Sequence, residues 1–108
     1  MFNKPTYYTY CFIRKDLNPT QKIVQLGHAT YELAKRQPQD DSEPCNLILF
    51  EIKDEKELVA TSYYLEHNGI EHYMFDEPDY DLGFTAIACV PVTGQQREIF
   101  SEFRLHRH

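Results

Sequence analysis

The sequence predicts a small α/β domain in which a four-stranded mixed sheet lies between helices, with the element order βαβαββα. Three observations predict it. Two nearly continuous apolar runs are each followed by a helical pattern, a later strand connects to the next through a loop alone, and a capped helical pattern closes the chain. The two strand-helix-strand units imply parallel pairing, and the direct connection lets the fourth strand run antiparallel.

The first two elements have clear signals. Residues 7–13 are aromatic and β-branched with few breaks, which predicts a strand covered on both faces. Turn residues at Asn18 then start a helical pattern over residues 20–36. Its apolar positions span an arc of roughly 220°, so we expect this helix to be covered on more than one side.

The second strand-helix unit follows a polar connection at residues 37–44. Residues 45–52 contain another apolar strand, and Asp54 with an acidic first turn predicts a helix over residues 55–67. The Asn-Gly pair at 68–69 ends that helix, because glycine suits the left-handed position after a last turn.

The remaining elements are shorter. Residues 70–75 predict a third strand, residues 76–83 an acidic loop, and residues 84–92 a fourth strand. A final helix begins near Thr93 and carries apolar residues on one face.

Length and composition limit the classes of protein. A chain of 108 residues can bury roughly two-thirds of its unfolded surface, enough for one core, so residues 1–108 are predicted to form a single domain. The longest apolar run, residues 47–50, is far too short for a membrane span, and the start of the chain lacks the apolar middle of a signal peptide. We therefore expect a cytoplasmic protein with no membrane partner.

Cysteine usage and charge agree with this expectation. Cys11, Cys45 and Cys89 are scattered and odd in number, which indicates reduced thiols rather than a disulfide frame or a zinc site. The net charge of −6 argues against a protein whose whole surface binds phosphates. The loop at 76–83 lacks the third oxygen ligand and the spacing of a calcium loop, so a solvated turn is favoured there and weak Mg²⁺ binding is only a remote alternative. No metal site and no cofactor are predicted.

The predicted topology gathers charged residues at one edge of the sheet. The carboxyl ends of the first three strands meet there, and open α/β sheets usually form their sites at such an edge. The charged residues placed at this edge are Arg14, Lys15, Asp16, Lys22, Asp54 and Asp76.

The opening segments carry a recognisable motif. Ile-Arg-Lys-Asp-Leu at 13–17, followed by Gln-Lys-Ile-Val-Gln-Leu-Gly-His-Ala at 21–29, resembles the signature of the type II peptidyl-tRNA hydrolases. That family reads Arg-x-Asp-Leu and then Gly-Lys-x-Ala-Ala-Gln-x-x-His-Ala. Thr-Ala-Ile-Ala at 85–88 is similar to the family's Thr-Val-Leu-Ala strand. The first motif is fairly specific, and the resemblance continues in outline over nearly the whole chain.

The resemblance implies a metal-independent enzyme that hydrolyses the ester between a peptide and the terminal ribose of tRNA. It assigns Lys22 and Asp76 as catalytic residues, Lys22 as an electrostatic donor in the first turn of a helix and Asp76 as the group that orients water. These two side chains are expected to face each other across one groove. The substrate-binding candidates are Arg14, Lys15, Asp16, Gln25, His28 and Thr85.

Without the resemblance, the same residues also fit purely structural roles. Lys22 and Asp76 could form a partly exposed ion pair, worth about 0–1 kcal/mol and without catalytic function. His28 shares a polar stripe with Gln25 and Glu32, where a structural role such as a hydrogen bond to a neighbouring loop is favoured.

The loop at 76–83 departs from the family pattern. It reads Asp-Glu-Pro-Asp-Tyr-Asp-Leu-Gly, so the family's Asp-Ala-Gly-Arg-Thr-Gln loop has no arginine or threonine counterpart here. Its four carboxylates repel tRNA phosphates, which disfavours tRNA as a partner. The alternative function is a catalytically inactive binding module that uses this loop to recognise a basic or small-molecule partner. A homodimer is a further alternative, with an aromatic interface at Tyr63, Tyr64, Tyr73 and Phe84.

Overall fold

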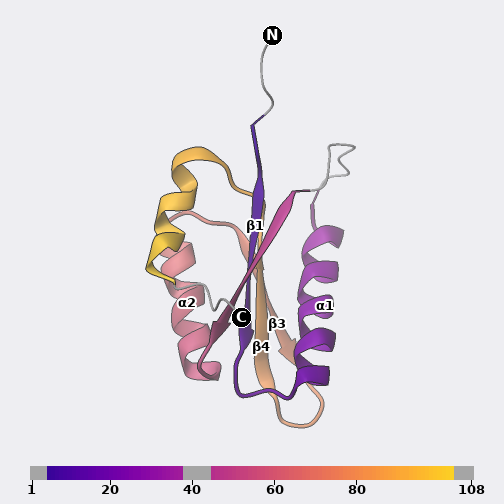
Figure 1. Ribbon diagram of the computed structural model, residues 1–108. Helices are drawn as coiled ribbons and strands as arrows, with labels where there is room; N and C mark the ends of the chain where they lie inside the picture. Colours follow the sequence, from indigo (N-terminus) through magenta and orange to yellow (C-terminus); the bar gives the residue numbers. More distant parts are fainter. Residues whose placement is uncertain (1–4, 38–44, 104–108) are drawn as a thin grey trace.

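The computed structural model describes residues 5–37 and 45–103. They form a four-stranded sheet with α1 on one face and α2 with the 3₁₀ helix η1 on the other (Figure 1). The elements in chain order are β1 (Tyr8–Arg14), α1 (Pro19–Lys35), β2 (Asn46–Ile52), α2 (Glu55–His67), β3 (His72–Glu77), β4 (Gly83–Cys89) and η1 (Gly94–Glu102). The α/β class, the mixed sheet and the order of elements are as the sequence predicts.

The strand order across the sheet is β2-β1-β4-β3. β1 pairs in parallel with β2 and antiparallel with β4, and β3 pairs antiparallel with β4. Consequently β1, β2 and β3 run in the same direction, and their carboxyl ends lie at one edge of the sheet. The chain's last strand is an inner strand, next to β1.

Both long helices begin with side-chain caps. Asn18 Oδ1 accepts a 2.8 Å hydrogen bond from the Gln21 amide, and Gln21 Oε1 accepts a 3.0 Å bond from the Asn18 amide. This reciprocal pair is a capping box, and Pro19 supplies a preset φ at the first helical position. Asp54 caps α2 by accepting from the Glu57 amide at 3.0 Å. The caps fix where each helix starts, at the edge where β1 and β2 end.

The sheet buries a hydrophobic layer on each face, because successive strand residues point to opposite sides. The α2 and η1 face holds Phe12, Phe50, Leu58, Leu65, Ile87 and Phe100. The α1 face holds Cys11, Ile13, Ala29, Leu33, Ala86 and Ala88. The prediction that the first strand is covered on both faces is therefore confirmed.

The prediction that the first helix is covered on more than one side is wrong. Ile23 is 74% exposed, Val24 47% and Tyr31 65%. The reason is the number of layers, since α1 packs only against the sheet and no other described element lies over its outer face. The helix instead buries Gln25, Ala29 and Leu33.

Two other expectations change in detail. The last helix is a 3₁₀ helix, and β3 begins at His72, continues through Asp76 to Glu77 and has an irregular register between Phe75 and Asp76. Of the connection expected at residues 37–44, all but the first residue lie outside the described part of the chain. Among the described residues, no helix is both long and apolar enough to cross a membrane.

The aromatic residues suggested for a dimer interface do not form one exposed surface. The Tyr64 hydroxyl donates a 2.7 Å hydrogen bond to the Ile99 carbonyl, and Phe84 packs against the core. Tyr73 lies under the Arg36 guanidinium, 4.3 Å from carbon to ring centroid. Tyr63 is the exposed member, at 69%. Three of the four rings are thus used within the chain itself.

Candidate functional site

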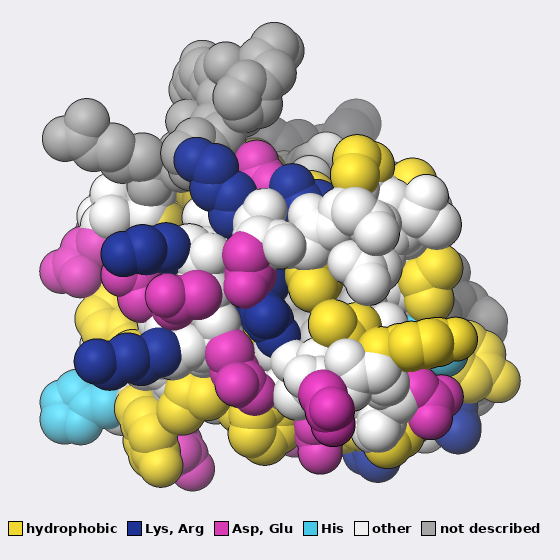
Figure 2. All heavy atoms as spheres, turned by 90° about the horizontal axis from the view of Figure 1, so that it is seen from below, with side chains coloured by type: hydrophobic (Ala, Val, Ile, Leu, Met, Phe, Trp, Pro, Cys, Tyr) yellow, Lys and Arg dark blue, Asp and Glu magenta, His cyan; other side chains and the backbone are white. Residues whose placement is uncertain are grey.

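The predicted site edge is a densely charged surface. It is formed by the carboxyl ends of β1, β2 and β3 and by the first turns of α1 and α2. Figure 2 looks onto this end of the molecule and shows Lys, Arg, Asp and Glu side chains interspersed across it. Most of these charges have specific partners, and those partners decide which groups can take part in chemistry.

Lys22 forms an ion pair with Glu51, a residue of β2. Its Nζ lies 2.7 Å from Glu51 Oε2, and the two side chains are 28% and 22% exposed. The ammonium stands in the first turn of α1, where unpaired backbone N–H groups add partial positive charge. A lysine ammonium has three N–H donors, and Glu51 accepts one of them. A fixed, half-buried donor therefore lies at the edge.

Asp76 lies at the same edge but not opposite Lys22. Glu51 belongs to β2 and Asp76 to β3, the two outer strands of the sheet, which are separated by β1 and β4. Three strand spacings amount to about 14 Å, too far for one water molecule to bridge. The expectation that Lys22 and Asp76 share a groove is therefore wrong, and the carboxylate at the ammonium is Glu51.

Gln25 and Thr85 form a buried hydrogen-bonded pair behind this edge. Gln25 is 3% exposed and Thr85 is fully buried. The Thr85 hydroxyl donates to Gln25 Oε1 at 2.7 Å, and Gln25 Nε2 donates to Glu77 Oε2 at 2.8 Å. The pair thus ties α1 to β4 and to the end of β3, as a structural link between two residues that the resemblance assigns to substrate binding.

Glu77 is held as an anion by its donors. The hydrogen bond from Gln25 and a second one from the Asp79 amide lower the pKa of Glu77 below its ordinary value of 4.5. A carboxyl with a lowered pKa is a poor general acid at neutral pH. Glu77 therefore anchors the loop rather than supplying a proton.

Arg14 and Asp16 form a bidentate ion pair. Two parallel bonds, of 3.0 and 2.8 Å, join the guanidinium to the carboxylate. Their mutual hydrogen bonding raises the pKa of Arg14 and lowers that of Asp16. Arg14 Nη1 also donates to the carbonyls of Leu82 and Phe84, so this guanidinium clamps the loop between β3 and β4 onto β1. Arg14 thus links Asp16 to the loop before β4, although the Asp16 side chain itself is 44% exposed.

Lys15 and His28 differ from the other substrate-binding candidates. Lys15 is exposed and directly follows β1. Its backbone amide donates to the Ile52 carbonyl at the end of β2, so the residue lies at the edge of the sheet. His28 stacks on Phe75, with ring centroids 4.7 Å apart and planes 5° apart. Stacking on β3, rather than the expected hydrogen bond to a loop, is the contact that the structure gives this ring.

The acidic loop ends in a strained turn. Tyr80 and Asp81 have φ values of 61° and 54°, and the Leu82 amide approaches the Asp79 carbonyl at 3.4 Å. Positive φ at both central residues is the geometry of a type I′ hairpin turn, which usually carries Asn-Gly. Tyr80 is 88% exposed at its tip. The strained turn therefore presents an aromatic ring beside exposed carboxylates.

Glu51 is the functional candidate that sequence reasoning missed. It stands alone as a charge within the apolar run Asn46–Ile52, so it has to point to one face of an otherwise hydrophobic strand. That isolated charge is the available signal, because it requires a partner or solvent on the α1 side. Within residues 5–37 and 45–103, no group of three metal-ligating side chains is placed to hold an ion.

The comparisons with known proteins show the fold alone. No family model matches the sequence, and no curated protein matches it significantly. Among solved structures, the chain is similar to Atu0240, a protein of unknown function from Agrobacterium tumefaciens strain C58, at 14% sequence identity and a TM-score of 0.67. The match covers 99% of this chain and 100% of that one.

Proposed function

We propose that the protein is a divergent peptidyl-tRNA hydrolase-like enzyme that acts at the edge formed by α1 and β2. The observation that carries the proposal is the Lys22–Glu51 pair. The partly exposed ammonium of Lys22, in the first turn of α1, is fixed 2.7 Å from the Glu51 carboxylate of β2. The sequence motif around Lys22 agrees with it, since that motif names Lys22 and Gln25 together.

The proposed reaction is hydrolysis of the ester between the peptide and the 3′-terminal ribose. Water adds to the ester carbonyl carbon, the bond from that carbon to the ribose oxygen breaks, and the ribose oxygen takes up a proton. The products are a peptide with a free carboxyl group and a tRNA with a free hydroxyl. The chain's task is to stabilise the negative charge that develops on the carbonyl oxygen.

Lys22 is the group that supplies this stabilisation. Among residues 5–37 and 45–103, Lys22 Nζ donates to Glu51 and leaves two N–H donors for a substrate, and the first turn of α1 reinforces their positive charge. Glu51 acts as a positioning residue, because it fixes the ammonium and can accept a hydrogen bond from the attacking water. Lys15, exposed at the same edge, can contact a phosphate of the substrate. The water-orienting role first assigned to Asp76 therefore passes to Glu51.

The test is peptide release from a peptidyl-tRNA by the wild type, by Lys22→Met and by Lys56→Met. Lys56 is an exposed lysine of α2 and serves as the matched control. We expect Lys22→Met to lower kcat/KM by about 10²–10³-fold, as for loss of one donor to a developing oxyanion, and Lys56→Met to leave it unchanged. Glu51→Gln should lower kcat more than it raises KM. Equal turnover by Lys22→Met and wild type, or none by the wild type, would refute the enzyme.

A second candidate function rests on the loop at residues 76–83, as a binding module for a basic partner. The specific observation is Tyr80, which is 88% exposed on a turn whose backbone is strained at two positions. Each left-handed residue other than glycine costs about 1–2 kcal/mol. A ring flanked by the carboxylates of Asp79 and Asp81 suits a lysine or arginine side chain, through charge pairing and a cation–π contact.

A lysine-rich peptide tests this second function. Asp79→Asn/Asp81→Asn and Tyr80→Ala should each weaken its binding at least tenfold, whereas Glu66→Gln/Glu71→Gln, which removes two exposed carboxylates elsewhere, should not. Equal weakening by both double variants would indicate attraction to overall negative charge instead of recognition by the loop.

A further inference from the structure

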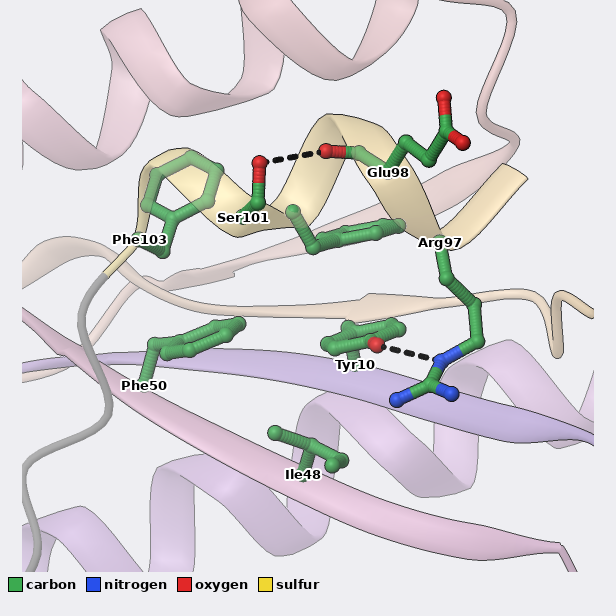
Figure 3. Close-up of a pocket in the computed structure, with 8 residues that line it drawn as sticks. Tyr10, Ile48, Phe50, Arg97, Glu98, Ser101 and Phe103 are labelled. Atoms are coloured by element: carbon green, nitrogen blue, oxygen red, sulfur yellow. Dashed lines mark hydrogen bonds between the residues drawn. The ribbon is translucent and has the colours of Figure 1, made fainter. Parts of the chain in front are cut away.

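A cavity of about 310 Å³ lies between η1 and the β1–β2 half of the sheet, on the face opposite α1 (Figure 3). Most of its wall is apolar, and the residues that make it are Tyr10, Ile48, Phe50, Phe100 and Phe103. Pockets that bind small molecules have volumes of about 300–1,000 Å³ and mostly apolar walls with a few polar groups. This cavity is at the small end of that range.

The cavity follows from how the helices cover the sheet. α2 packs on β4, β1 and β3, and the outer strand β2 is left to the shorter η1. Phe100 of η1 stacks on Tyr10, with ring centroids 3.8 Å apart. The ring centroids of Phe103 and Phe50 are 5.5 Å apart. Ile48 of β2 lines the same cavity and remains half-buried.

Arg97 is held rigidly at one end of the cavity. Its Nε donates a 3.0 Å hydrogen bond to the Tyr10 hydroxyl, and its central carbon lies 3.6 Å from the centroid of the Tyr8 ring. These contacts fix the plane of the guanidinium and use one of its five N–H donors. The two terminal nitrogens are oriented as a fork, the geometry that binds a planar carboxylate with two parallel hydrogen bonds.

Arg97 lacks the acidic partner that the other described arginines have. Arg14 pairs with Asp16 and Arg36 pairs with Glu32. In residues 5–37 and 45–103 no carboxylate lies within ion-pair distance of Arg97. An arginine ordered by two tyrosines and left without an anion offers charge complementarity to an anionic ligand.

The other polar groups at the cavity narrow the class of anion. The Ser101 hydroxyl donates to the Glu98 carbonyl at 2.8 Å, so its proton is already used. Glu98 also lines the cavity, and its carboxylate points away from the Arg97 guanidinium (Figure 3). Arg97 is the one cationic side chain among the described lining residues, and a single guanidinium favours a monoanion over a phosphate dianion.

We propose that this cavity binds a monoanionic aromatic carboxylate, with its ring among the aromatic side chains and its carboxylate paired to Arg97. Flat rings on the wall favour a flat ligand, because aromatic pairs stack or meet edge to face. The volume suits a single ring with a short acidic side chain. The site lies on the sheet face, away from Lys22 and Glu51, and is independent of the proposed hydrolysis.

The experiment titrates the whole protein with phenylacetate, phenylacetamide and inorganic phosphate, followed by chemical shifts of backbone amides. We expect phenylacetate to bind at least tenfold more tightly than the amide, to shift residues of η1 and β2, and to outcompete phosphate. Equal affinity for acid and amide, or no shifts at η1 with phenylacetate, would overturn the proposal. This comparison needs the wild-type protein only.

Variants then locate the charge. Arg97→Met keeps the apolar stem and should weaken phenylacetate binding at least tenfold while leaving binding of the amide unchanged. Arg36→Met, at the exposed arginine that follows the last residue of α1, is the matched control and should bind like the wild type. Ser101→Phe should abolish binding of both ligands by filling the cavity. Unchanged acid binding by a folded Arg97→Met would contradict the proposal.

Discussion

The Thr85 hydroxyl donates a 2.7 Å hydrogen bond to Gln25 Oε1, and both side chains are almost completely buried. This bond joins α1 to the inner strand β4, beneath the edge where Lys22 lies. A buried polar pair of this kind is costly to break from one side, because the remaining partner loses a bond that water cannot replace.

Thr85→Val should therefore destabilise the protein by about 1–3 kcal/mol, since valine keeps the shape and leaves Gln25 Oε1 without its donor. Urea unfolding measures the change. Thr30→Val is the comparison, because the Thr30 hydroxyl bonds only to carbonyls of its own helix. A smaller loss in Thr85→Val than in Thr30→Val would show that the buried bond contributes little.

Gly83→Ala should cost about 2–4 kcal/mol. Gly83 has φ 69°, and a Cβ there would collide with the carboxylate of Glu55. That carboxylate accepts a 2.8 Å bond from the Phe84 amide, so moving it also loses a charge-assisted hydrogen bond. Gly69→Ala has a similar φ of 72° with open space around it and should cost only about 1–2 kcal/mol. Equal losses of stability in the two variants would mean that the Glu55 side chain moves away from the new Cβ at no cost.

Stability should fall in acid partly through Glu77. Its pKa is lowered in the folded state by donors from Gln25 and Asp79, whereas the unfolded chain has the ordinary value of 4.5. The stabilisation is therefore present above about pH 4.5 and is lost as the pH falls through the lower, folded value. In an NMR titration, Gln25→Leu should raise the pKa of Glu77, and Gln95→Leu, a change on exposed η1, should leave it unchanged.

Thiol reactivity should separate Cys45 from the other two cysteines. Burial raises the pKa of Cys11 to about 12 and also raises that of Cys89. At pH 8 a thiol with a pKa near 12 has roughly a thousandfold less thiolate than an ordinary one. Half-buried Cys45 should react first with a thiol reagent, and Cys45→Ser should remove the fast phase. A fast phase that persists in Cys45→Ser would contradict the burial of Cys11 and Cys89.

Local patterns predicted the elements well because each depends on nearby residues. The capping residues Asn18 and Asp54 set the helix starts, and the apolar run ending at Ile52 defined β2. The pattern predicts that the apolar residues of α1 are covered on more than one side, whereas several are exposed, because hydrophobic periodicity does not tell how many layers a domain has.

The candidate site was predicted only in part, because its pairs depend on the order of strands. The edge itself follows from the direction of β1, β2 and β3, and Lys22 lies there as expected. Which carboxylate meets Lys22 depends on the strand order, because β1 and β4 lie between β2 and β3. The pattern of residues along the chain does not specify that order. The motif pointed to Asp76, and the strand order selects Glu51.

The place of β4 also has a consequence for biosynthesis. β4 follows the other three strands in the chain, yet it joins the β2-β1 pair to β3 through partners such as Cys11 with Ala88. While the ribosome still holds residues 83–89, β1 and β2 can pair with each other, whereas residues 72–77 have no strand to pair with, because β4 is the partner of β3 in the described sheet. The sheet therefore cannot close before β4 is available, and release of the polypeptide before Cys89 would leave the β1-β2 pair and residues 72–77 without the strand that joins them.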